Sequence, residues 1–277
     1  VDEPESWVGQ LQRQLSRDAQ CSARRGFPGG VEVLNFGVGG YGTGQEWLTW
    51  RHLARQYQPS LVLLALYPGN DFTDNEPRPR NDRPVFRLDH AGHLQRDDSF
   101  RASATYRWRS SWPGQLLDGL MNHSRLLQLL NEAKNRWANR SPSTPAPRTT
   151  EPPAPAPTPQ ASDQAWAITE ALIARLAADT AAHGARLMVV STSTPEQVWP
   201  RRQQRPADPF AQERRLAAML AAHHIPYQPL GPVLQQDADA RGLTLHGFAG
   251  QAPGLGHWNA TAHRLAAAAI APWMCGR

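Results

Sequence analysis

Residues 61–71 read LVLLALYPGND, an apolar run that ends in turn-forming residues. The apolar part spans residues 61–66, and proline, glycine, asparagine and aspartate follow it directly. Short continuous runs of this kind are typical of strands that are buried on both faces of a parallel sheet. The stretch therefore predicts a strand over 61–66 in the core of an α/β domain.

Segments with strand and helix character alternate on both sides of this run. Further strands are expected at 31–36, 186–191 and 225–228. Helical spacing of apolar residues predicts helices over 5–19, 44–57, 114–138, 164–182, 208–223 and 231–242, and a last helix capped by Asn259, whereas the polar residues 72–112 are expected to be irregular. Asp163 is the expected N-cap of the helix over 164–182. Such alternation predicts a mostly parallel sheet with helices on both faces.

The composition suits one large domain over residues 1–277. Hydrophobic residues make up 40% of the chain and include 10 Trp, enough for a sizeable core. Residues 141–162 contain eight prolines and no aromatic residue. We interpret this segment as a linker or mobile insertion, because it has no apolar face to bury and the alternation resumes after it.

The chain is basic, with a formal net charge of +5, and Lys134 is its only lysine. The arginines are scattered with short clusters, and no nucleic-acid motif accompanies them, so a solvated basic surface is favoured over a nucleic-acid site. Attraction to anionic glycans or lipid headgroups stays open. No apolar run reaches the length of a transmembrane helix. Cys21 and Cys275 lack the spacing of a metal site, and a disulfide and two free thiols both remain open.

Three polar or glycine-rich segments follow predicted strands or precede the last helix. They read NFGVGGYGTG at 35–44, GND at 69–71 and GHWN at 256–259. Each segment alone is common in tight turns and helix caps. A dinucleotide site is disfavoured, because the glycine spacing fits only loosely and no acidic residue ends the strand over 61–66.

Taken in order, these blocks resemble the SGNH/GDSL hydrolases. The resemblance covers about residues 1–75 and 185–273, and rests on FGVGGYGT at 36–43, GND at 69–71 and GHWNATAHR at 256–264. It implies a three-layer α/β/α, flavodoxin-like fold and serine chemistry on acyl esters with no cofactor and no metal. It also implies that Gly40 and Asn70 form the oxyanion hole and that His257 is the general base. His263 is the second choice for the base, and its place in the first turn of a helix favours a structural role.

The chain departs from the family pattern at two places. The family's Gly-Asp-Ser block should precede the first helix, but residues 1–7 resemble the segment that follows it. We therefore expect the first strand and the nucleophile to be missing from this chain, which alone should lack hydrolase activity. An orienting acid is expected just before His257, where Gly254 and Leu255 stand, and the more distant Asp237 and Asp239 are not assigned.

The resemblance predicts an exported esterase or deacylase that acts on a carbohydrate or lipid ester. Export here means a periplasmic, extracellular or membrane-anchored protein. The alternatives are an acyltransferase of the same fold that acts on a polysaccharide, and a non-catalytic glycan-binding protein. The missing acid before His257 favours the binding protein modestly. The natural ester and the oligomeric state stay open.

Overall fold

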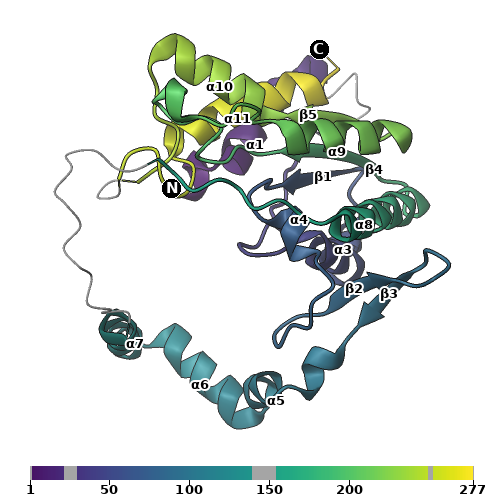
Figure 1. The fold of residues 1–277 in the computed structure, drawn as a ribbon, viewed down its shortest axis with the longest axis vertical. Coiled ribbons are helices and arrows are strands. Elements are labelled where there is room, and N and C mark those ends of the chain that lie inside the picture. The colour runs from purple at the N-terminus through teal and green to yellow at the C-terminus, as the bar shows by residue number, and fades with distance from the viewer. Residues whose placement is uncertain (1, 22–29, 139–153, 249–251, 277) are drawn as a thin grey trace.

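The computed structural model describes residues 2–21, 30–138, 154–248 and 252–276. The chain is mixed α/β, and its main sheet has three parallel strands in the order β1-β4-β5 (Figure 1). These are β1 (Leu61–Leu66), β4 (Arg186–Ser191) and β5 (Tyr227–Pro229). The strands predicted at 61–66 and 186–191 are confirmed, and β5 lies within one residue of the predicted end of the strand at 225–228.

Helices pack on both faces of this sheet. Those that carry the buried core are α1 (Trp7–Arg17), α3 (Thr43–His52), α8 (Asp163–Ala182), α9 (Ala211–Ala222), α10 (Leu230–Arg241) and α11 (Ala260–Met274). Shorter helical elements are α4 (Asp71–Asp74) and the 3-10 helices Glu3–Glu5, Ala54–Tyr57, Ser99–Ala102 and Arg202–Gln204. The predicted cap of the last helix is confirmed, since Asn259 Oδ1 accepts the Ala262 N–H.

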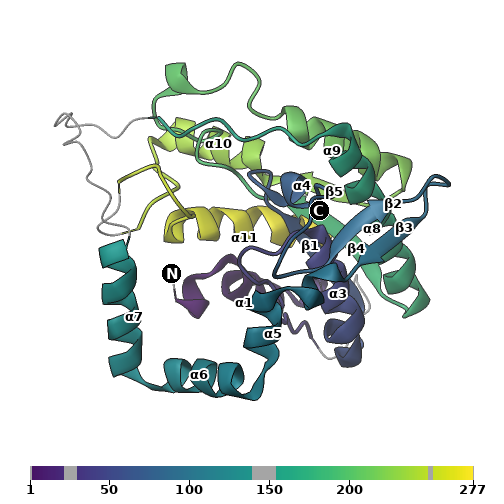
Figure 2. The same ribbon diagram turned by 60° about the horizontal axis from the view of Figure 1, so that its bottom comes forward.

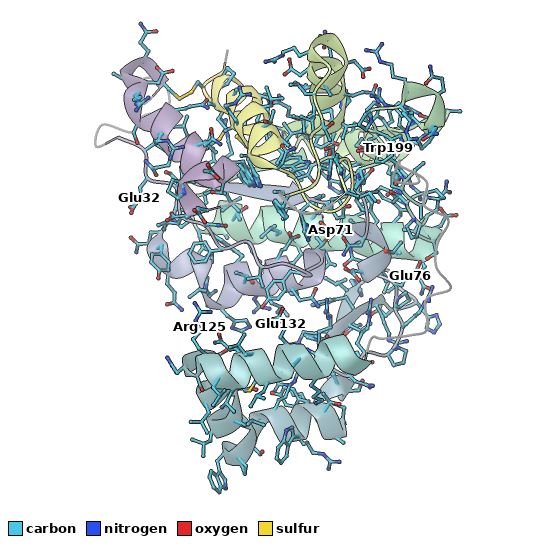
Figure 3. All side chains as sticks on the ribbon, turned by 90° about the vertical axis from the view of Figure 1, so that its left-hand side faces the viewer. Glu32, Asp71, Glu76, Arg125, Glu132 and Trp199 are labelled. Atoms are coloured by element: carbon cyan, nitrogen blue, oxygen red, sulfur yellow. A yellow bond between two sulfur atoms is a disulfide. The ribbon has the colours of Figure 1, made fainter. Side chains whose placement is uncertain are left out.

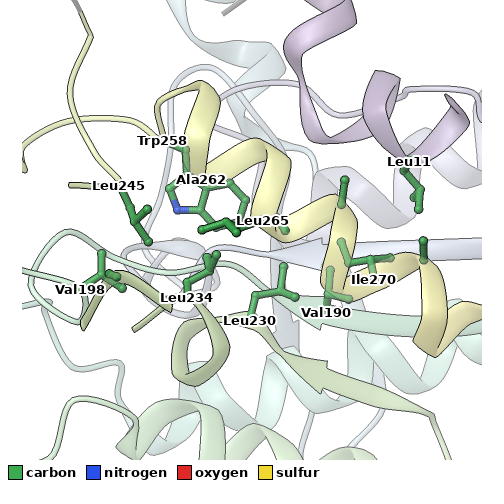
Figure 4. Close-up of a cluster of buried hydrophobic side chains, with 14 of the residues drawn as sticks. Leu11, Val190, Val198, Leu230, Leu234, Leu245, Trp258, Ala262, Leu265 and Ile270 are labelled. Atoms are coloured by element: carbon green, nitrogen blue, oxygen red, sulfur yellow. The ribbon is translucent and has the colours of Figure 1, made fainter. Parts of the chain in front are cut away.

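Alternate side chains of β4 point into two separate cores, as the two-residue period of a strand requires. Val190 joins the core formed with α1, α10 and α11, which Figure 4 shows around Leu230 and Ile270. Leu187 and Val189 join the core formed with α3, α8 and α9. The central strand is therefore buried on both faces, as its uninterrupted apolar sequence predicts.

Three predictions of local structure are wrong. Residues 31–36 form no strand, because no described strand lies beside them; the Gln12 side chain instead bonds the Val31 carbonyl and the Val33 N–H. Residues 72–112 contain an antiparallel hairpin of β2 (Val85–Leu88) and β3 (Leu94–Asp97). The hairpin's short, Arg-containing strands give too few apolar residues for the pattern to appear. Helix α8 is capped by Ser162, one residue before the predicted Asp163.

A disulfide joins Cys21 and Cys275, whose Cα atoms are 5.0 Å apart. It ties the segment after α1 to the end of α11, and these two helices lie side by side (Figure 2). The pairing left open by the sequence is thus settled. A crosslink across 254 residues of chain removes much of the conformational freedom of the unfolded state.

The proline-rich segment is only partly described. Residues 154–162 form no helix or strand. The Thr158 N–H and hydroxyl both bond Glu196, which lies in the segment after β4. The part of this prediction that falls on residues 141–153 lies outside the described residues.

Before this segment the chain forms three consecutive helices, α5 (Ala104–Ser110), α6 (Trp112–His123) and α7 (Arg125–Ala138). We call them the helical arm. Helices α6 and α7 confirm the prediction of one or two helices over 114–138, whereas α5 lies within residues 72–112, which the sequence predicts to be irregular. No helix within the described ranges is long and apolar enough to span a bilayer.

Candidate functional site

Asn70 lies four residues after the carboxyl end of β1 and immediately before helix α4. Its backbone N–H bonds the Tyr67 carbonyl, and its side-chain amide donates to Asp74 Oδ2 at 2.5 Å. Arg80 bonds the other oxygen of the same carboxylate at 3.0 Å. An amide has two N–H groups, so Asn70 can hold this contact and still donate to a second acceptor.

Gly40 lies in the glycine-rich loop that follows residues 31–36. Its φ of 80° is in the left-handed region, and a Cβ built there would meet no atom within 4 Å, so a ligand can approach this backbone closely. Its carbonyl accepts a bond of 2.7 Å from Arg83. A Cβ on nearby Gly42 would lie 2.9 Å from Asp74 Cβ, so the loop runs against α4. The structure therefore brings the Gly40 loop and Asn70 to the same end of the sheet.

His257 is exposed and lies in the loop that leads into α11. Its neighbour Trp258 is buried and donates from Nε1 to Ser193 Oγ at 2.8 Å. Ser193 lies just past the end of β4, and the adjacent Thr192 N–H bonds the last carbonyl of β1, Leu66, at 2.8 Å. The His257 loop is thus fixed at the carboxyl ends of β1 and β4. No hydrogen bond joins His257 to Gly40 or Asn70 within the part of the chain that the structure describes.

His246 holds the His257 loop in place through two polar contacts, and no pattern in the sequence marks it as a site residue. It is buried, its Nδ1 lies 2.8 Å from the Gly256 carbonyl, and its Nε2 lies 3.5 Å from Ser193 Oγ. Burial lowers the pKa of His246 to about 4, so the ring is neutral at pH 7. Nδ1 must then carry the proton, because a carbonyl only accepts. His246 therefore fixes the chain one residue before His257.

His263 connects two helices. Its Nδ1 accepts the Trp7 N–H at the start of α1 (3.1 Å), and its ring meets the Trp258 ring edge-on at 5.7 Å. Burial lowers the pKa of His263, which favours the neutral acceptor form that this contact needs. These contacts stabilise the packing of α1 on α11.

No carboxylate stands beside His257 in the described residues at the positions where the family pattern expects one. Gly254 has a φ of 90°, and a Cβ there would lie 2.4 Å from the Trp199 ring, so any side chain at 254 is excluded. Position 255 is a half-buried leucine. Asp239 pairs with Arg205 at 2.6 Å, and Asp237 pairs with Arg241 on its own helix.

Two interacting carboxylates, the buried Asp71 and the partly buried Glu46, lie next to Asn70. Asp71 Oδ2 accepts the Tyr67 N–H at 2.5 Å, and burial raises the pKa of Asp71 to about 7. Burial and the nearby Asp71 raise the pKa of Glu46 well above its ordinary value. Glu46 Oε2 is buried and has no hydrogen-bond partner among the residues that the structure describes. Two neighbouring carboxyl groups in a low-dielectric site resist ionising together, so the pair retains a proton near neutral pH.

A slot of about 440 Å³ opens beside β1. Residues 30–37 line one wall and residues 60–65 the other, with Trp7, Leu11 and Glu46 among the remaining lining residues. Strand β1 pairs with β4 on one edge only, and no described strand pairs with the edge that faces the slot. Unpaired strand edges expose N–H and C=O groups that readily bond another strand.

Metal ligands do not gather anywhere in the described residues: no group of three or more His, Cys, Asp or Glu side chains is placed to hold an ion. Comparison of the chain with models of protein families, with curated proteins and with solved structures gives no match.

Proposed function

We propose that this chain is the larger part of a serine esterase or deacylase of the SGNH/GDSL type, with a three-layer α/β/α fold. The proposal rests on one observation. The Gly40 loop, Asn70 and the His257 loop, which are far apart in sequence, all lie at the carboxyl ends of β1 and β4. Ligand sites of parallel α/β sheets form at that edge.

In the proposed reaction a serine hydroxyl attacks the ester carbonyl while His257 removes the proton of that hydroxyl. The carbonyl oxygen becomes an oxyanion, which accepts hydrogen bonds from the Gly40 backbone N–H and the Asn70 amide. The collapse of the intermediate expels the alcohol, to which His257 returns the proton, and water then releases the acyl group by the same steps. A donor of this kind typically lowers the activation barrier by about 3–4 kcal/mol. With leucine at 255, the base would work as part of a Ser-His dyad.

The nucleophile would come from a strand that ends in Gly-Asp-Ser and pairs with the open edge of β1. The slot between β1 and residues 31–36 supports this assignment, because its two walls are the segments that such a strand would join. Strands in a sheet are about 4.8 Å apart, so a backbone placed there could bond both walls. The unpaired Glu46 Oε2 offers an acceptor to one of its donors.

The disulfide supports export as part of the same proposal. Cys21–Cys275 is formed, and structural disulfides persist mainly in periplasmic and extracellular compartments.

The test compares this 277-residue chain with a version extended at its N-terminus by any residues that its gene encodes upstream. A fluorophosphonate probe should label one serine in the extended protein and none in this chain, and only the extended protein should hydrolyse a short p-nitrophenyl ester. Specific labelling of this chain, or an upstream segment that lacks a serine at the strand end, would refute the proposal.

A glycan-binding protein without catalysis is the second candidate. The observation that favours it is position 255, where leucine replaces the orienting acid, together with the closed position 254. Titration of the extended protein with acylated and deacylated oligosaccharides separates the candidates, since a binding protein would retain the acylated sugar unchanged. An acyltransferase would instead move the acyl group onto the sugar acceptor in the same assay.

A further inference from the structure

We call the main sheet and the helices α1, α3, α8, α9, α10 and α11 that pack on it the body. The helical arm presents an apolar surface that the body does not cover. Its exposed large apolar residues are Trp108, Trp112, Leu116, Leu117, Leu120, Leu126, Leu129 and Leu130. Trp112 is the most exposed, at 77%. Figure 1 shows the three helices below the sheet and its flanking helices, and Figure 2 shows them in sequence around three sides of an open frame. A concentration of exposed apolar residues on three consecutive helices is typical of a docking surface.

The apolar residues form stripes along α6 and α7. Trp112, Leu116 and Leu120 recur every four residues, which places them on one face of α6. Leu126, Leu129 and Leu130, at positions i, i+3 and i+4, lie within one broad face of α7. Figure 3 labels Arg125 and Glu132 on the side of α7 turned toward the rest of the molecule. Seven residues separate those two, so they share a face, which also carries Leu129, whereas Leu126 and Leu130 are turned away from it by about 100–160°.

The charge of the arm distinguishes the kinds of partner it can bind. Residues 101–138 contain six basic residues and two acidic ones, Asp118 and Glu132. Arg107, Arg109, Arg125 and Lys134 are exposed beside the apolar stripes. A second copy of the same basic surface would be repelled, whereas an anionic surface would be attracted.

We propose that the helical arm is a membrane-interface element that lies on anionic phospholipid bilayers. Tryptophan and leucine enter the boundary between headgroups and acyl chains, and arginine meets the lipid phosphates. Trp112, at the start of α6, and Leu126 and Leu130 of α7 are exposed and enter this boundary. The element lies on the membrane and does not cross it. It would hold the carboxyl edge of the sheet near lipid or surface-glycan esters, a consequence that rests on the proposed function, although the binding itself does not.

The experiment is flotation of the 277-residue protein with phosphatidylcholine vesicles, with and without phosphatidylglycerol. The protein should float with the anionic vesicles, and high salt should weaken this binding. The combined variant Trp112→Ser, Leu126→Ser, Leu130→Ser should lower the partition coefficient roughly tenfold or more. The matched control Leu53→Ser, an exposed leucine of the body, should leave it unchanged. Replacing Arg107, Arg109 and Arg125 with glutamine should weaken binding to anionic vesicles alone.

Trypsin gives a second measurement without any variant. Anionic vesicles should protect the bonds after Arg107, Arg109 and Arg125 and leave cleavage after Arg202, on the body, unchanged. Absence of flotation, or equal flotation with neutral and anionic vesicles, would overturn the proposal. So would a dimer in sedimentation that the triple serine variant abolishes, because a second copy would then occupy the face. Since this test needs no esterase activity, its failure and that of the proposed function are separable.

Discussion

Leu172 of α8 and Leu126 of α7 both lie on helices rich in apolar residues, yet their surroundings are opposite. Leu172 has no exposed surface and is packed against the sheet, whereas Leu126 is 67% exposed on the helical arm. The body buries its leucines because strands and helices from distant parts of the sequence meet there. The arm is built from consecutive helices that contact mainly their neighbours in sequence. The comparison separates residues that specify the fold from residues that are available to a partner.

Removal of the proposed base should lower turnover more than any other substitution in the proposed site, whereas changes in the helical arm should leave turnover unaffected. In the extended protein, His257→Ala should lower kcat by about 10⁴-fold or more, since the serine would lose its proton acceptor. The arm variant Leu126→Ser should leave turnover of a soluble p-nitrophenyl ester unchanged. Activity retained in His257→Ala and lost in His263→Ala would show that the other histidine is the base. Circular dichroism checks that each variant is folded.

Truncation of the two leucines compares the regions directly. Leu172→Ala should lower the free energy of unfolding by about 2–5 kcal/mol, because it leaves a cavity in a packed core. Leu126→Ala should change it by less than about 0.5 kcal/mol, as expected for a surface position. Urea unfolding of the 277-residue chain measures both values. A large loss from Leu126→Ala would mean that the arm packs on the body in solution and is not a free docking surface.

The same comparison explains how far the sequence predicts this structure. The strands at 61–66 and 186–191 could be predicted, since continuous apolar runs leave few other ways to be buried. Residues 31–36 are also mostly apolar, apart from Glu32 and Asn35, but no described strand pairs with them, and pairing depends on a partner that local sequence does not reveal. The Cys21–Cys275 bond depends likewise on how the chain ends meet.

The candidate site was predictable only in part. Gly40, Asn70 and His257 stand out because they belong to ordered blocks that lie beside strands. His246 does not, since its role comes from two contacts, with Gly256 and Ser193, that form only after folding. The carboxylate pair of Glu46 and Asp71 joins a helix to a strand end, and neither residue alone indicates burial.

A smaller loss is expected at the proposed oxyanion hole. Asn70→Ala in the extended protein should lower kcat by about 10²–10³-fold, because one donor to the oxyanion is lost while the base remains. Asn70→Asp is the sharper variant, since it keeps the shape but places a carboxylate where an N–H donor is needed and beside Asp74. The KM of a short ester should change little in Asn70→Ala. Unchanged turnover would remove Asn70 from the mechanism.

The smallest expected effect concerns the carboxylate pair of Glu46 and Asp71. Both pKa values are raised in the folded chain, so between about pH 4 and pH 7 the unfolded chain binds fewer protons than the folded one. Stability should therefore be greatest at the acidic end of this window and fall as the pH rises through it.

Glu46→Gln removes one of the two ionisations and with it the repulsion between the two carboxylates. It should stabilise the chain at pH 8 by about 1–3 kcal/mol and flatten the dependence of stability on pH, whereas the exposed control Glu5→Gln should do neither. Urea unfolding between pH 5 and pH 8 measures the slope. If a strand occupies the slot in the extended protein and donates to Glu46 Oε2, the carboxylate gains a partner there. The benefit of Glu46→Gln should then shrink or reverse in the extended protein. An equal benefit in both proteins would mean that the slot stays open beside β1.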